Sequence, residues 1–152
     1  MTRRLATASV TSRLSGLRGR AIVAVRGHHF VVDSPLALGG PNEEVNPMDL
    51  LLSALATHGT FICERAAQEM GIPLHSVSIT AEGEFDPRGV TGERVDPGLQ
   101  TLHVRLALSG PTEAQCQALA EAVRTRCPVY TTLARAVPID LETVTESSVV
   151  GY

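Results

Sequence analysis

The 152-residue chain has few aromatic residues, no lysine and only three cysteines. Tryptophan is absent and aromatic residues make up 3% of the chain, so stacked aromatic platforms for single-stranded nucleic acid are not expected. All 13 basic residues are arginine, and the formal net charge of −3 argues against a protein that binds a phosphate backbone. No apolar run approaches the roughly 18 residues that a membrane-spanning helix needs. The sequence therefore predicts no nucleic-acid partner and no membrane partner.

The three cysteines are too few, and odd in number, for a scaffold held by disulfides. Any thiol chemistry is therefore expected from individual side chains. With 43% hydrophobic and 19% charged residues, the chain is not a disordered tail, and its length suits a single domain over residues 1–152. The first residues do not have the charged and then apolar pattern of an export signal, so we expect a cytoplasmic protein.

Residues 1–32 contain six arginines and no acidic residue. Organellar presequences share this composition, but the valines in this stretch favour a basic pair of β-strands. We predict strands over residues 5–11 and 20–33, with turns at Ser15-Gly16 and at residues 26–28.

The clearest predicted element is a helix over residues 47–70. Asn46 is a good N-cap, Pro47 suits the first helical position, and Asp49 stands where a capping box needs an acid. Gly71 follows as a stop signal. Apolar residues cover most of the helix circumference, which is typical of a helix buried in the middle of a domain or in an interface. One subunit of this size has little material to surround such a helix, so we expect a homodimer.

The rest of the chain alternates between strand and helix patterns. Residues 86–98, rich in Gly, Pro and Asp, are predicted to link two of the strands as a hairpin loop. The element order predicts an α+β fold with antiparallel sheets. The predicted elements are strands over residues 75–85, 99–109 and 138–145, a helix over residues 112–126, and a short helix over residues 129–136.

Cys127 is the strongest candidate for chemistry from the residues alone. Arg124 and Arg126 flank it, and nearby cations favour the reactive thiolate. Pro128 interrupts the helix, which is expected to leave the thiol at a break where it can be reached. The alternative is a small buried apolar residue, a common role of free cysteine.

His58 is unusual because it stands in an apolar run in the middle of the long helix. A buried imidazole needs a hydrogen-bonding partner. That partner is either a backbone carbonyl or, in a functional interpretation, the thiol of Cys127. Cys63 and Cys116 stand among apolar helix residues and are expected to pack in the core. The other histidines show no metal-ligand spacing, and no phosphate-binding or dinucleotide-binding glycine motif occurs, so no cofactor or metal is expected. These histidines are His28, His29, His75 and His103.

Two segments resemble the OsmC/Ohr family of osmotically inducible and organic hydroperoxide resistance proteins, and most closely its OsmC-like branch. They are RGHHFVVDSPLALGGPNEEVNPMDLLLSALATHGTFICERAAQEMGIPL and RTRCPVYTTL. The resemblance implies an intertwined α+β homodimer, with antiparallel sheets wrapped around two long central helices and active sites at the subunit interface. It also implies that one cysteine attacks a hydroperoxide and that a second resolves the sulfenic acid into a disulfide, which a dithiol then reduces.

By this resemblance, Cys127 takes the position of the resolving cysteine and Asp49 that of a carboxylate that orients the attacking thiolate. The orienting arginine corresponds to Arg18, with Arg13 and Arg20 as alternatives.

The position of the attacking cysteine falls on His58, so the family's two-cysteine mechanism is not expected in its usual form. Cys63 is five residues further on, which places it about 140° around the helix and about 7 Å along it. A simple relocation of the nucleophile to Cys63 is therefore not expected.

Three hypotheses follow from the sequence. In the first, Cys127 is the lone nucleophile of a hydroperoxide reductase, His58 lowers its pKa, and an external dithiol restores the enzyme. In the second, the protein has no peroxidase activity and binds a small apolar or oxidised ligand at the dimer interface. In the third, His58 and Cys127 form a weak metal site, although two ligands are too few for structural zinc.

Overall fold

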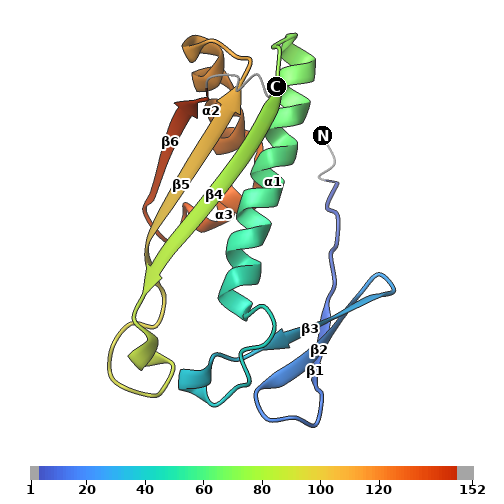
Figure 1. Ribbon diagram of the computed structural model, residues 1–152, viewed down its shortest axis with the longest axis vertical. Coiled ribbons are helices and arrows are strands. Elements are labelled where there is room, and N and C mark those ends of the chain that lie inside the picture. The colour runs from blue at the N-terminus through green and yellow to red at the C-terminus, as the bar shows by residue number, and fades with distance from the viewer. Residues whose placement is uncertain (1–3, 147–152) are drawn as a thin grey trace, which may run out of the picture. The chain divides into compact units, whose positions relative to one another are not determined.

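The computed structural model describes residues 4–146 (Figure 1). Contacts divide the chain into two compact units, residues 1–50 and 51–152, with the boundary at the end of the first turn of a long helix. We call them the N-terminal unit and the C-terminal unit. Each contains its own three-stranded sheet. The single domain predicted from the sequence would comprise both units.

The N-terminal unit is built on an antiparallel sheet with the order β1-β2-β3. Its elements are β1 (Thr11–Leu14), β2 (Arg20–Val25), β3 (His28–Asp33) and a single 3₁₀ turn, η1 (Leu36–Leu38). The predicted strand over residues 5–11 is wrong in position, since the strand begins at Thr11. The reason is that β2 turns back after Val25, which leaves residues 5–10 without a strand to pair with.

A tight turn joins β2 and β3 where the sequence predicts one. Arg26 and Gly27 both have positive φ angles, 49° and 82°, as a two-residue type I′ hairpin turn requires. This turn fixes the register, so that Arg20 at the start of β2 lies opposite Asp33 at the end of β3.

The loop that follows β3 folds back tightly onto the turn before β2. The backbone N–H of Ser34 donates a hydrogen bond to the carbonyl of Gly19 over 2.7 Å. Gly19 and Gly40 approach so closely that a Cβ atom on Gly19 would collide with Cα of Gly40. Glycine at these two positions therefore allows the loop to reach the sheet.

The C-terminal unit contains a second sheet with the order β4-β5-β6 (Figure 1). The long helix α1 (Pro47–Met70) leads into it from the N-terminal unit. The elements that follow are β4 (Ser76–Phe85), a 3₁₀ turn η2 (Pro87–Gly89), β5 (Leu99–Ser109), α2 (Glu113–Arg126), α3 (Pro128–Leu133) and β6 (Ile139–Thr145). These bounds confirm the predicted helices and strands of this region to within a few residues.

The direction of β6 corrects the prediction of antiparallel sheets. β4 and β5 are antiparallel, as expected for two strands joined by a hairpin loop, but β5 and β6 are parallel. The helices α2 and α3 form a crossover that returns the chain to the start of β5, so β6 runs in the same direction as its neighbour. The sheet is therefore mixed.

Helix α1 is buried on one face only within the single chain. Gly59 lies at the centre of this face, where an added Cβ would stand 2.7 Å from Cδ1 of Ile79 and 3.7 Å from Cγ1 of Val123. On another face Phe61 is 64% exposed. The predicted burial around the whole helix is thus not achieved within one chain. The buried residues of α1 are Leu55, Gly59, Cys63, Ala66 and Ala67. None of the helices within residues 4–146 is long and apolar enough to cross a membrane.

Candidate functional site

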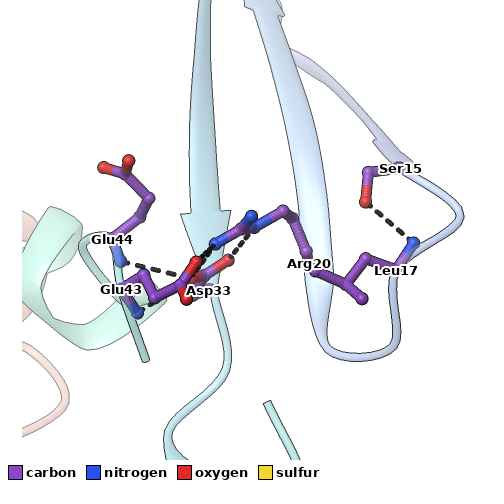
Figure 2. A network of polar contacts seen from close by, with 6 residues as sticks. All are labelled: Ser15, Leu17, Arg20, Asp33, Glu43 and Glu44. Carbon is purple, nitrogen blue, oxygen red and sulfur yellow. Dashed lines mark hydrogen bonds and ion pairs between the residues drawn. The ribbon is translucent and has the colours of Figure 1, made fainter. Parts of the chain in front are cut away.

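A partly buried ion pair joins the two ends of the β2–β3 hairpin. Arg20 lies side-on to Asp33, with Nε donating to Oδ1 over 2.7 Å and Nη2 donating to Oδ2 over 2.8 Å. The same Nη2 also donates to Oε2 of Glu43 over 2.7 Å (Figure 2). The side chain of Asp33 has no exposed surface, whereas that of Glu43 is 69% exposed. The network therefore has a buried end and a solvent-facing end.

Asp33 also holds the loop that precedes α1. Its Oδ2 accepts the backbone N–H groups of Glu43 and Glu44 over 3.0 and 3.1 Å. The hydrogen bonds from Arg20, helped by these backbone donors, lower the pKa of Asp33 to about 2 against the opposing effect of burial. The two carboxylates in turn raise the pKa of Arg20. At neutral pH the cluster therefore combines one guanidinium with two carboxylates.

A mostly apolar groove of about 380 Å³ lies beside this network, formed entirely by residues of the N-terminal unit. Arg20 and Asp33 supply its charged groups. Its volume falls within the roughly 300–1,000 Å³ usual for small-molecule sites. The apolar side chains in its walls include Leu14, Val23, Val32, Pro35, Leu38 and Leu50.

Of the three arginines considered from the sequence, the structure brings Arg20 to the groove. Arg18, the first choice, is exposed, and its guanidinium lies against Gly39, where an added Cβ would stand 3.2 Å from Nη2. Arg13 is exposed on β1. Neither Arg18 nor Arg13 lines the groove.

Asp33 and Glu43 were not among the residues singled out from the sequence. A signal for Asp33 was nevertheless present, because a two-residue turn at positions 26 and 27 places residue 33 opposite residue 20. No local signal indicated Glu43, which reaches Arg20 through a loop.

Asp49 caps α1, as the sequence predicts. Its Oδ2 accepts the backbone N–H of Asn46 over 2.9 Å, and Oδ1 of Asn46 accepts the N–H groups of Met48 and Asp49 over 2.8 and 3.0 Å. This reciprocal pair satisfies backbone donors that a helix start leaves without partners. The carboxylate of Asp49 is therefore engaged in the cap and exposed at its surface.

Cys127 lies at the junction of α2 and α3 with no exposed surface. Its Sγ accepts the backbone N–H of Tyr130 over 3.4 Å, so the thiol caps α3 from inside the core. The expectation that the helix break leaves this thiol accessible is wrong for the single chain. Pro128 ends α2 as expected, but the chain turns the Cys127 side chain inward among apolar neighbours.

The cations next to Cys127 in the sequence are engaged elsewhere. Arg126 donates to both carboxylate oxygens of Glu69 on α1, over 2.7 and 3.2 Å. Arg124 donates to the backbone carbonyl of Leu141 over 3.2 Å. Adjacency in sequence therefore does not place either guanidinium in a hydrogen bond with the thiol.

His58 has a buried Nδ1 atom with no hydrogen-bond partner among residues 4–146. The hydrogen bonds in this part of the chain include none between His58 and Cys127, whose Sγ is bonded to Tyr130. The predicted bond to a backbone carbonyl is also not formed at Nδ1. Burying a polar atom without a hydrogen-bond partner costs free energy. Residues 4–146 of a single chain therefore leave Nδ1 of His58 without the hydrogen-bond partner that it needs.

Cys63 and Cys116 pack in the core of the C-terminal unit, as expected from their apolar surroundings. Burial raises the pKa of Cys63 to about 12, with a smaller contribution from the neighbouring thiols of Cys116 and Cys127. The thiol of Cys63 therefore stays protonated and unreactive at neutral pH. Within residues 4–146 no three His, Cys, Asp or Glu side chains gather as metal ligands.

The comparison with family models gives the class of the protein. Residues 40–142 match the family model described as OsmC-like protein, so the chain belongs to the OsmC-like family. The solved structure of an OsmC-like protein from Mycoplasma pneumoniae is similar to 93% of this chain and 99% of its own, with a TM-score of 0.80 at 17% identity.

Two organic hydroperoxide resistance proteins have the same fold. One, from Elizabethkingia anophelis and with thiocyanate bound, matches with a TM-score of 0.77 at 18% identity, over 95% of this chain and all of its own. The other, from Legionella pneumophila, matches with a TM-score of 0.73 at 19% identity, over 93% of this chain and 98% of its own. No curated protein sequence matches the chain.

Proposed function

We propose that this OsmC-like protein binds a small apolar or oxidised molecule in the groove of the N-terminal unit and does not carry out the family's two-cysteine peroxidase reaction. The observation that carries the proposal is that all three thiols are fully buried, while a charged group of the chain, Arg20, lines a largely apolar groove. By resemblance, the attacking cysteine of the family is replaced by His58. The remaining thiol on α1, Cys63, is held protonated by burial.

The proposal includes a homodimer in the cytoplasm. Phe61 is 64% exposed, and in the described part of the N-terminal unit only Val23 and Val32 are buried hydrophobic side chains. Such a small core does not stabilise a unit of this size by itself. The strand β4 is also an edge of its sheet within residues 4–146, and its ten residues offer backbone groups to a further strand. A second copy of the chain would cover these surfaces and supply surroundings for His58.

A hydroperoxide reductase with Cys127 as its only nucleophile is the second candidate. The observation that favours it is the N–H of Tyr130, which donates to Sγ and would stabilise a thiolate at the start of α3. The thiolate would attack ROOH to form a sulfenic acid and release ROH after protonation. A dithiol would then reduce the sulfenic acid to the thiol and release water and a disulfide.

Consumption of an organic hydroperoxide in the presence of a dithiol separates the two candidates. The native chain, Cys127→Ser, His58→Cys and, as a matched control for loss of a buried thiol, Cys116→Ser are compared. We expect the native chain to be inactive and His58→Cys to gain turnover. Turnover by the native chain would overturn the binding proposal. Its loss in Cys127→Ser but not in Cys116→Ser would establish the lone-nucleophile enzyme.

A further inference from the structure

Residues 4–10, which we call the N-terminal arm, belong to no helix or strand and lie directly before β1. In the arm Leu5 is 84% exposed and Val10 is 61% exposed. The arm lies outside residues 40–142, which match the family model. An extended chain from residue 5 to residue 14 has ten residues, the same length as β4. The arm can therefore lengthen β1 into a strand that matches β4.

The pairing of β1 with β2 shows which backbone groups of the arm are free to bind another strand. The N–H of Ser15 donates to the carbonyl of Arg20 over 3.0 Å, directly after the antiparallel pairing of the two strands. Backbone groups of successive residues in such a pair point alternately toward the partner strand and away from it. Odd-numbered residues of β1 therefore face β2, and even-numbered residues face the free edge. Continued through the arm, this alternation leaves the backbone groups of Ala6, Ala8 and Val10 for a further strand.

The free edges of β1 and β4 carry opposite charges. Arg4 and Arg13 are exposed, as are Glu82 and Glu84 on β4, and none of the four takes part in an ion pair among residues 4–146. The two arginines would stand about 30 Å apart on an extended strand, so in either direction one of them reaches the end of β4 that carries the glutamates. Pairing β1 with β1, or β4 with β4, would bring like charges together, which is unfavourable.

The other edge of the same sheet, β6, is a poorer partner for the arm. Its carboxylates already lie beside basic side chains of β5. Oδ2 of Asp140 is 3.7 Å from Nδ1 of His103, and Oε1 of Glu142 is 3.5 Å from Nε of Arg105. The carboxylates of β4 have no such partner among residues 4–146, so β4 is the edge that attracts a basic strand.

Both edges also alternate polar and apolar side chains. In β4 every second side chain is exposed and polar, while Val77, Ile79 and Ala81 pack against the core. In the arm and β1, polar residues alternate with mostly apolar ones in the same way. Paired positions of adjacent strands share a face of the sheet, so one pairing places both polar rows outward. The polar rows are Ser76, Ser78, Thr80, Glu82 and Glu84 in β4, and Thr7, Ser9, Thr11 and Arg13 in the arm and β1.

We propose that the N-terminal arm of one copy adds as a strand to β4 of a second copy, and that the opposite charges of the two edges select this pairing. The inference rests on the homodimer of the proposed function and names the segment and the edge that form it. A two-fold axis repeats the contact, so each dimer contains it twice. The backbone hydrogen bonds supply affinity, and the charges supply selectivity.

Proline substitutions in the arm test the strand addition. Ala8→Pro removes an N–H that faces the added strand, whereas Thr7→Pro, the matched control, removes one that faces away. Neither residue belongs to a helix or strand of the single chain, so the fold of one chain should not change. In sedimentation equilibrium of the full chain, we expect Ala8→Pro to raise the dimer Kd at least about tenfold and Thr7→Pro to change it less than about twofold.

Charge reversal tests the selection of one edge by the other. One variant carries Arg4→Glu with Arg13→Glu, and the other carries Glu82→Arg with Glu84→Arg. Each variant alone places like charges at both contacts of the dimer, so its dimer Kd should rise about tenfold or more. A mixture of the two variants restores opposite charges at both contacts, so heterodimers should form with about the native Kd.

Glu113→Arg with Glu121→Arg is the control for net charge, because both residues are exposed on α2. This pair should leave the dimer Kd within about twofold of the native value. Equal effects of the two proline variants, or a mixture of the reversed variants that dimerises no better than either alone, would overturn the inference while leaving the homodimer in place. A native chain that sediments as a monomer would overturn the proposed homodimer as well.

Discussion

Sγ of Cys127 accepts the backbone N–H of Tyr130 over 3.4 Å, inside a core where the thiol has no exposed surface. In the single chain Cys127 is therefore the N-cap of the short helix α3. Removing this cap should lower the free energy of unfolding. That loss can be measured separately from any reactivity of the thiol.

We expect Cys127→Ala to lower the free energy of unfolding by about 1 kcal/mol more than Cys116→Ala does. Both substitutions remove a fully buried thiol, but only Cys127 caps a helix. Urea unfolding followed by circular dichroism measures the difference. Equal losses in the two variants would show that the hydrogen bond to Tyr130 does not contribute to stability.

The thiols of the folded protein should react very slowly with a disulfide reagent at pH 8. Burial raises the pKa of Cys63 to about 12, so only about one thiol in ten thousand at this position is ionised at that pH. All three cysteines are fully buried in the single chain. The absorbance of the thiolate released from the reagent should therefore remain near zero for the folded protein. It should reach three equivalents per chain once denaturant is added. Rapid native labelling assigned to Cys63 by mass spectrometry would contradict this expectation.

Stability should fall in acid because carboxyl groups, Asp33 and Glu69 among them, have lowered pKa values in the folded protein. The pKa of Asp33 is about 2 because Arg20 donates hydrogen bonds to it, and that of Glu69 is about 2 because Arg126 and Arg65 do the same. Both groups are more acidic folded than unfolded, so their stabilisation is complete above the ordinary carboxyl pKa of about 4 and is lost as the pH falls to about 2.

Urea midpoints measured from pH 6 to pH 2 check this dependence. Glu69→Gln should lose less stability between pH 6 and pH 2 than the native chain does, because the carboxyl group of Glu69 is no longer there to be protonated. Glu64→Gln is the matched control, because Glu64 lies on the same helix and is exposed. If the urea midpoint of Glu69→Gln fell as steeply with pH as that of the native chain, the role of the ion pairs would be contradicted.

The capping box of α1 should show strong coupling between its two members. We expect Asn46→Ala to destabilise the protein by about 1 kcal/mol, because two backbone donors lose their acceptor. Asp49→Ala should add less in the Asn46→Ala background than in the native chain, since the two side chains act reciprocally. A double-mutant cycle from chemical unfolding measures the coupling. Additive effects would show that the two caps act independently.

Local signals in the sequence predicted much of the fold. The start and end of α1 and the turn between β2 and β3 each depend on residues within about four positions of one another. In the structure this turn places residue 20 opposite residue 33, a pairing that was not predicted. The antiparallel direction expected for β6 was wrong, because the direction depends on how a helical crossover packs and not on the pattern of the strand itself.

The sequence by itself determined the OsmC-like elements and showed that a histidine stands in the apolar run of the central helix. Only the tertiary structure decided which charges and thiols are available. Arg126 is next to Cys127 in the chain but pairs with Glu69, 57 residues away, and the groove contains Arg20 instead of Arg18. Burial and choice of partner depend on segments brought together by folding, and a single sequence does not encode those distances in any local pattern.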